Sequence, residues 1–225
     1  MPGRVAESWR DFLMRLASLM FGLFLFSLGL VANLQSGLGM SSWGVLNVGL
    51  AKVTPLSLGQ ASQVIGLIVL VIGWALGFAP GFGTLANMFF VGLFIDLNMS
   101  WNLIVPSTNL IHQFLTLFLS IALIGVGSLF YLKPRLGAGP RDGLMMGLVR
   151  RYDRPVSTVR GVIEVTVLII GYLLGGPVGI GTVINAFGLG YSVQLAFRIG
   201  KYDRKSEHLD LLELINNLSG KATGD

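Results

Sequence analysis

The sequence contains no cysteine, only two histidines and few charged residues, and each scarcity excludes a class of function. Without cysteine there is no disulfide, no thiol nucleophile and no cysteine-ligated metal. His112 and His208 are far apart in the sequence and have no acidic cluster beside them, so we expect no metal site. No nucleophile–base pair is visible either. We therefore expect neither an enzyme nor a cofactor-binding protein.

Charged residues make up 12% of the 225 residues, about half of what a soluble domain carries. Four stretches contain no Lys, Arg, Asp or Glu, namely residues 16–51, 53–95, 97–132 and 165–197. Because about 20 apolar residues cross the hydrocarbon core as a helix, these stretches hold about six crossings. They lack strict alternation of apolar and polar residues. We therefore predict an all-α membrane protein with about six transmembrane helices.

The N-terminal basic residues have two interpretations. Arg4, Arg10 and Arg15 before an apolar run resemble a signal peptide, but the run over 16–34 is longer than a signal h-region and lacks a clear cleavage site. We interpret it as a retained first span. The net charge of +5 does not indicate a nucleic-acid partner, because cytoplasmic loops of membrane proteins collect Lys and Arg.

An internal repeat divides the chain. When the sequence is displaced by 98 residues, 22 of the 69 positions from Gly29 to Leu97 are identical without a gap, against about one in ten by chance. We predict a first repeat over residues 1–98 and a second over 99–198. Residues 199–225 then form a cytoplasmic amphipathic tail, which either lies on the membrane surface or packs on the bundle.

Each half has the same order of elements. A long helix is followed by a Gly-rich break, a short helix and two further spans. We predict the long helices at 12–34 and 110–132 and the short ones at 42–53 and 140–151. The remaining spans are predicted at 57–78, 82–97, 155–175 and 180–198. The short helices are too short to cross, so they are re-entrant or interfacial. Three crossings per half is an odd number, and the second repeat must therefore be inverted relative to the first.

The basic residues are distributed as this topology requires. With the N-terminus in the cytoplasm, segments 1–15, 133–160 and 198–225 hold 15 of the 16 Lys and Arg residues, and Lys52 alone is external. This is the distribution of the positive-inside rule. We therefore predict a multi-pass cell-membrane protein with both termini in the cytoplasm.

Three motifs resemble those of a known family. Ser36-Gly37-Leu38-Gly39 followed by Trp43, the run from Gly139 to Leu144, and the run from Gly175 to Thr182 are similar to the YczE/YitT-type bacterial membrane proteins. The resemblance covers about residues 15–198. It implies a small multi-span protein of the bacterial inner membrane and brings no established substrate. The family tends to have Pro-Trp-Asp in the first repeat where this chain has Ser-Trp-Gly at 42–44, so only the acid of the second repeat, Asp142, is kept.

The Gly-rich breaks are candidate sites. A short helix after such a break exposes unpaired N–H groups at a positive dipole end, and paired half-helices of this kind build substrate sites in many transporters. The candidates are Ser41 and Ser42 in the first copy and Pro140-Arg141-Asp142 in the second. The alternative is structural, since glycines 37, 39, 137 and 139 also permit tight turns.

Further polar groups lie within the spans. Asn87 and Asn185 are repeat-equivalent, and inverted symmetry either brings the two amides together at a central axis or leaves each in a separate inter-helix hydrogen bond. Glu164 lies about 10 Å into its span, with Arg160 one turn earlier as a possible partner. The predicted substrate site consists of polar and aromatic residues from both repeats: Trp43, Asn47, Asn87, Arg141, Asp142, Glu164 and Asn185.

We therefore expect a small-solute transporter or channel-like permease of the bacterial inner membrane. Its expected partners are the lipid bilayer and an unidentified small solute, and the Gly73-x-x-x-Gly77 and Gly171-x-x-x-Gly175 motifs serve helix packing within the chain or in a homodimer. The alternative is a non-transporting membrane partner that assists or regulates another envelope protein. A transporter should have a polar cavity lined by Asn87, Asn185 or Glu164, whereas a scaffold should be packed there.

Overall fold

The computed structural model describes residues 9–202, which form eight helices and no strand. In order they are α1 (Trp9–Gln35), α2 (Ser42–Val53), α3 (Leu58–Ala75), α4 (Phe82–Ser100), α5 (Leu110–Leu132), α6 (Pro140–Tyr152), α7 (Val156–Leu173) and α8 (Ile180–Ile199). Every predicted helix is present, with ends within a few residues of those expected. The amphipathic segment predicted in the tail lies outside the described residues.

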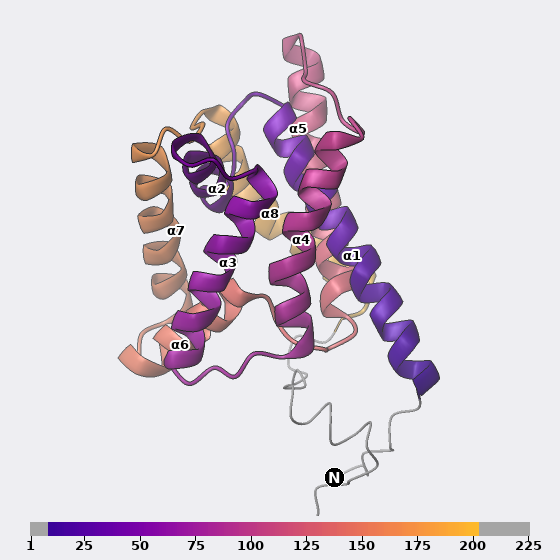
Figure 1. Cartoon of the computed structure of the whole chain (residues 1–225), viewed down its shortest axis with the longest axis vertical. Coiled ribbons are helices and arrows are strands. Elements are labelled where there is room, and N and C mark those ends of the chain that lie inside the picture. The colour runs from indigo at the N-terminus through magenta and orange to yellow at the C-terminus, as the bar shows by residue number, and fades with distance from the viewer. Residues whose placement is uncertain (1–8, 203–225) are drawn as a thin grey trace, which may run out of the picture.

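Six of the eight helices are long and apolar enough to cross a membrane: α1, α3, α4, α5, α7 and α8. The other two, α2 and α6, have 12 and 13 residues and are too short to span the hydrocarbon core. Figure 1 shows α2 near one end of the molecule and α6 near the opposite end. The prediction of an all-α protein with six membrane-spanning helices is confirmed.

The core lies along α1 and α5, which pack on each other over their length. Their backbones approach closely at two glycines. A Cβ added to Gly22 would overlap the backbone nitrogen of Tyr131, and one added to Gly127 would lie 2.6 Å from that of Phe26. Buried Leu23 and Ile124 fill the same interface. Small residues thus allow the helix contact that membrane proteins use in place of a hydrophobic driving force. Helix α4 packs against α1, and α8 packs against α5.

Contacts between the two halves occur in reciprocal pairs. The N–H of Gly83 donates to the carbonyl of Leu136 at 2.6 Å, and the N–H of Gly181, 98 residues later, donates to the carbonyl of Leu38 at 2.7 Å. Likewise α6 packs on α3 as α2 packs on α7. Such exchanged contacts are those expected of two repeats related by a two-fold rotation. The inversion of the second repeat remains a prediction.

Tight turns precede both short helices. Gly39 has a φ of 101° and Gly137 a φ of 134°, a region that residues with a side chain rarely adopt. Each turn is also closely packed, because a Cβ on Gly39 would lie 2.5 Å from the nitrogen of Gly179 and one on Gly137 would lie 2.9 Å from the hydroxyl of Thr84. The structural role proposed for these two glycines is therefore present. Gly139, with a φ of −63°, has an ordinary conformation.

The two glycines of each Gly-x-x-x-Gly motif have different roles. Gly73 and Gly171 pack within the chain, where a Cβ would meet the backbone of Leu144 on α6 at 3.1 Å and of Leu46 on α2 at 2.5 Å. Gly77 and Gly175 have positive φ and stand just after the ends of α3 and α7. The second glycine of each motif thus ends a helix in a left-handed conformation rather than packing two helices together.

Candidate functional site

A tryptophan, an arginine and a glutamate meet where the two halves of the chain join. The indole Nε1 of Trp43 on α2 donates to Oε1 of Glu164 on α7 at 3.1 Å. The guanidinium carbon of Arg141 on α6 lies 4.5 Å from the centre of the Trp43 ring. We call these three residues the central trio. They connect both short helices to a membrane-spanning helix through one charge-assisted hydrogen bond and one cation–π contact.

The charges of this region come from the second repeat. Trp43 and Arg141 are 98 residues apart, so equivalent positions of the two repeats meet each other. Glu164 corresponds to Gly66 of the first repeat, where a Cβ would already lie 3.1 Å from the side chain of Met88. The carboxylate is thus present in the second repeat, whereas the equivalent position of the first repeat is a glycine beside Met88.

The start of α6 holds two of the charges. Gly139 is the N-cap residue, Pro140 occupies the first helical position, and Asp142 follows at the third. The backbone of Gly139 hydrogen-bonds the Asp142 carboxylate, as an acid in the third position of a capping box does. Burial raises the pKa of Asp142, and the positive charges of Arg160 and Arg141 oppose this shift.

The two arginines interact with the acids of this region. Burial lowers the pKa of the Arg141 guanidinium, and the charge of Glu164 acts most strongly against that shift. The charge of Arg160, a possible partner of Glu164 one turn along α7, acts on Asp142. Glu164 itself accepts a hydrogen bond from the Trp43 indole on α2.

A second group of polar side chains surrounds Gly139. The position of a Cβ on this glycine would lie 3.4 Å from the hydroxyl of Tyr131, 3.6 Å from Oδ2 of Asp142 and 3.9 Å from Oδ1 of Asn87. We call Asn87, Tyr131 and Asp142 the inner cluster. Asp142 adjoins Arg141 in sequence and the charge of Arg141 acts on its carboxyl group, so the inner cluster and the central trio are linked electrostatically.

The equivalent position in the other half is a network of amides. The Nδ2 of Asn33 donates to Oδ1 of Asn185 at 3.1 Å and to the hydroxyl of Ser120 at 3.0 Å. In return, Nδ2 of Asn185 donates to Oδ1 of Asn33 at 3.3 Å, and that oxygen also accepts the N–H of Ser41 at 3.3 Å. We call Asn33, Ser120 and Asn185 the amide network. All three side chains are buried.

Asn87 and Asn185 therefore do not form the central amide pair that was one expectation for them. Helix α4 begins beside the turn before α6, whereas α8 begins beside the turn before α2. Five residues into each helix, the amides still lie in opposite halves of the molecule, and each meets its own cluster.

Asn47 lies one turn after Trp43 on α2. It is 3% exposed, and its Oδ1 has no hydrogen-bond partner among the described residues. Three residues of the clusters, Asn33, Ser120 and Tyr131, were missed in the sequence. The repeat carried a signal for two of them, because a displacement of 98 aligns Asn33 with Tyr131 at the ends of the long helices.

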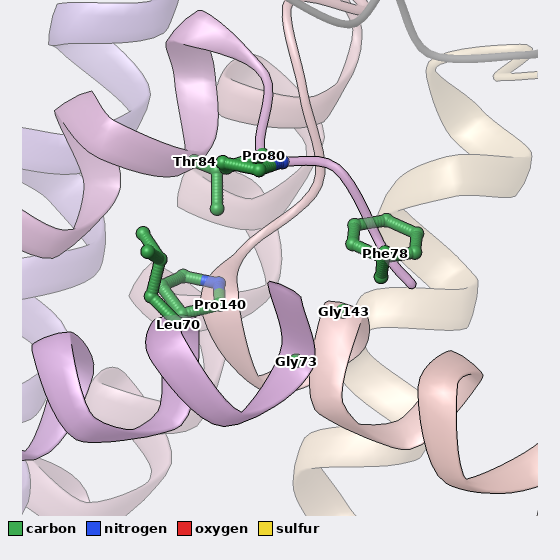
Figure 2. Close-up of a pocket in the computed structure, with 7 residues that line it drawn as sticks. All are labelled: Leu70, Gly73, Phe78, Pro80, Thr84, Pro140 and Gly143. Carbon is green, nitrogen blue, oxygen red and sulfur yellow. The ribbon is translucent and has the colours of Figure 1, made fainter. Parts of the chain in front are cut away.

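Neither of the two best-defined cavities of the described chain is lined by Asn87, Asn185 or Glu164. One, of about 10 Å³, has room for about one water molecule. Figure 2 shows Thr84 and Pro80 on one side of it and Leu70 and Pro140 on the other. The second, of about 290 Å³, is an apolar hollow on α5 lined by Leu110, Ile111, Phe114, Leu115 and Phe118. The cavity expected of an open transporter is therefore not among them.

Comparisons with known proteins identify relatives. A family model described as "Family of unknown function (DUF6198)" matches residues 13–198. The chain is 37% identical over 181 residues to an uncharacterized protein of Haemophilus influenzae, covering 80% of this chain and 82% of the relative. It is 34% identical to the uncharacterized membrane protein YczE of Bacillus subtilis, covering 77% of this chain and 85% of the relative. No solved structure matches the chain.

Proposed function

This chain belongs to the family of unknown function DUF6198. From its candidate site we propose that it is a small-solute permease of the bacterial inner membrane. In this proposal the second repeat is inverted relative to the first, both termini lie in the cytoplasm, and the solute binds at the central trio and the inner cluster. The observation that carries the proposal is the central trio. In it, Arg141 of one short helix contacts Trp43 of the other, and Trp43 binds Glu164 of a spanning helix.

The energetics of the trio support a role beyond folding. A carboxylate within a spanning helix, as Glu164 is in α7, costs about 2.5–3.5 kcal/mol on insertion scales. The hydrogen bond from Trp43 to Glu164 contributes about 1.5–3 kcal/mol. This gain does not exceed the cost of placing the carboxylate in the span. Apolar residues, as at Gly66 in the first repeat, would pack there at no such cost.

The packed surroundings of the trio are consistent with a permease whose solute site is narrow in this structure. Such a site widens when one group of helices moves relative to the other. The unpartnered oxygen of Asn47, one turn from Trp43, is a polar group that a solute or water can satisfy.

A second function is favoured by a different observation. The amide network is fully buried and connects α1, α5 and α8 by hydrogen bonds. Such a network is suited to a static scaffold, and it supports the alternative of a non-transporting partner that assists or regulates another envelope protein.

Purified protein and a library of small metabolites distinguish the two functions. The permease proposal expects at least one solute to raise the thermal unfolding temperature and to cross proteoliposome membranes. Glu164→Gln should keep the fold and lose both responses, because it preserves size and removes the charge that faces Arg141. Asp153→Asn, which removes an exposed carboxylate just after α6, is the matched control and should keep both responses.

Two results would refute the permease proposal. One is a library in which no solute stabilises or crosses with the native chain. The other is a Glu164→Gln variant with unchanged solute flux. Loss of folded protein on Glu164→Gln, with no solute response in the native chain, is the result that a static scaffold predicts.

A further inference from the structure

The last two helices of each repeat pack differently in the two halves. Helices α3 and α4 pack together between residues 57–66 and 88–96, whereas α7 and α8, their equivalents, do not pack together. Figure 1 shows α7 and α8 joined at the end of the molecule where α2 lies and diverging toward the end where α6 lies. One pair is closed and the other is open.

The closed pair has a close glycine contact. A Cβ on Gly59 of α3 would overlap the carbonyl oxygen of Gly92 on α4, and one on Gly92 would lie 2.5 Å from Cγ of Gln63. The Nε2 of Gln63 also donates to the carbonyl of Phe89 at 2.9 Å. Backbone and side chain therefore join α3 to α4.

An aspartate strengthens this closure. Oδ2 of Asp96 on α4 accepts the hydroxyl of Ser57 at 2.5 Å, and its Oδ1 accepts the N–H of Gly59 at 2.9 Å. We call Ser57, Gly59 and Asp96 the latch. Both bonds are charge-assisted, and they lie at the start of α3, far from the loop that joins α3 to α4.

The corresponding faces of α7 and α8 lack these contacts. Gly161 and Gly190 are the equivalents of Gln63 and Gly92, and a Cβ on either of them would have no atom within 4 Å. The latch aspartate is replaced by Gln194, and the serine that it binds is replaced by Pro155, which offers no hydroxyl. The faces remain small enough to pack as α3 and α4 do, but nothing charged holds them closed.

Glu164 lies on the face that this divergence uncovers. Residues 157, 161 and 164 of α7 are spaced as one helical face, and they correspond to 59, 63 and 66, which face α4 in the closed pair. Gly161 of α7 and Gly190 of α8 have open space around them, and Glu164 lies on the same side of α7 as Gly161.

We infer that the α7–α8 pair is the access route to Glu164 and that it closes onto itself, in the packing now seen for α3–α4, when the α3–α4 latch opens. The two pairs exchange their open and closed arrangements, so the site is reached from one end of the molecule at a time. With the predicted topology, the open route here faces the cytoplasm. This inference rests on the proposed permease function, but its test requires no solute.

Because the chain has no cysteine, introduced pairs report the closure directly. The Gly161→Cys/Gly190→Cys variant should form a disulfide with copper phenanthroline only when α7 reaches α8, since a disulfide needs Cα atoms about 4.4–6.8 Å apart. Adding Asp96→Asn, which removes the charge of the latch, should increase the initial cross-linking rate about tenfold. Ser57→Ala, which removes one latch bond, should give a smaller increase in the same direction. Val162→Cys/Gly190→Cys is the control, because Val162 follows Gly161 and its side chain points about 100° further around α7.

The outcomes separate this inference from the proposed function. Intramolecular cross-linking that accelerates when the latch is weakened supports the exchange, whether or not any solute is found. No cross-linking in either background, or a rate indifferent to both latch variants, would overturn it even if transport were demonstrated. A disulfide between two chains would overturn it as well, because the open face would then be an interface between copies.

Discussion

The amide network allows a matched comparison between repeat-equivalent residues. Asn185 is 1% exposed and exchanges two hydrogen bonds with Asn33 on another helix, at 3.1 and 3.3 Å. Asn87, its equivalent, is half-buried and has no such amide pair, because the residue equivalent to Asn33 is Tyr131. The same substitution to alanine should therefore destabilise the protein at one position and not at the other.

The size of the effect follows from the hydrogen bonds and the side-chain volume that the substitution removes. Inter-helix hydrogen bonds in membranes contribute about 0.6 kcal/mol each on average, so two contribute about 1.2 kcal/mol. Removing the amide leaves roughly 25 Å³ unfilled, which at about 24 cal/mol per Å³ costs a further ~0.6 kcal/mol. Asn185→Ala should thus lower the free energy of unfolding by about 2 kcal/mol. For a chain of this length that corresponds to a decrease of about 4–8 °C in Tm.

Thermal unfolding in detergent, followed by tryptophan fluorescence and by size-exclusion recovery, measures both variants. We expect Asn87→Ala to change the Tm by less than about 2 °C, as for a substitution outside the buried network. Equal decreases for the two variants would show that the amide network carries no special stability. A larger decrease for Asn87→Ala would refute the assignment of the buried network to Asn185.

Three further predictions concern pH, orientation and turns. The pKa of Asp142 is raised in the folded state, so the folded protein keeps this proton to a higher pH than the unfolded chain does. The free energy of unfolding should therefore fall as the pH rises from the ordinary to the raised pKa. Asp142→Asn should remove this part of the pH dependence. In intact cells an impermeant thiol reagent should label Leu103→Cys and not Arg154→Cys, and the reverse pattern would contradict the predicted orientation. Gly39→Ala should abolish folding, because Gly39 has a positive φ and a Cβ on it would meet the backbone of Gly179. Gly190→Ala should be neutral or stabilising, because a Cβ there has no atom within 4 Å. Equal effects of the two variants on expression and Tm would refute the packing described.

Features of the fold that depend on local sequence were predictable. A run of about 20 mostly apolar residues needs a helix wherever it lies in the chain, so the six spans followed from the long apolar runs. The short helices followed from Gly-rich breaks, as at Gly39 and Gly137, whose positive φ the structure shows. These features require no knowledge of which helices become neighbours.

The polar contacts depended on helix neighbours and were predicted only in part. Trp43, Arg141 and Glu164 were each candidates, but their meeting depends on where α2, α6 and α7 cross. Arg160 was a possible partner of Glu164 along one helix, and the hydrogen bond that Glu164 accepts comes from the indole of Trp43 on α2. The different packing of α3–α4 and α7–α8 was not foreseen, since small residues permit close packing without requiring it.

The contact between Trp43 and Arg141 has a consequence for the symmetry of the chain. In a dimer of two identical half-length subunits, the residue at this position would meet its own copy, giving two indoles or two mutually repelling guanidinium groups. Two copies that vary independently can instead place an aromatic ring in one and a cation in the other. Substituting Arg141 by Trp, or Trp43 by Arg, would recreate the self-contact of a symmetric pair. The stack therefore depends on the sequence divergence of the two repeats.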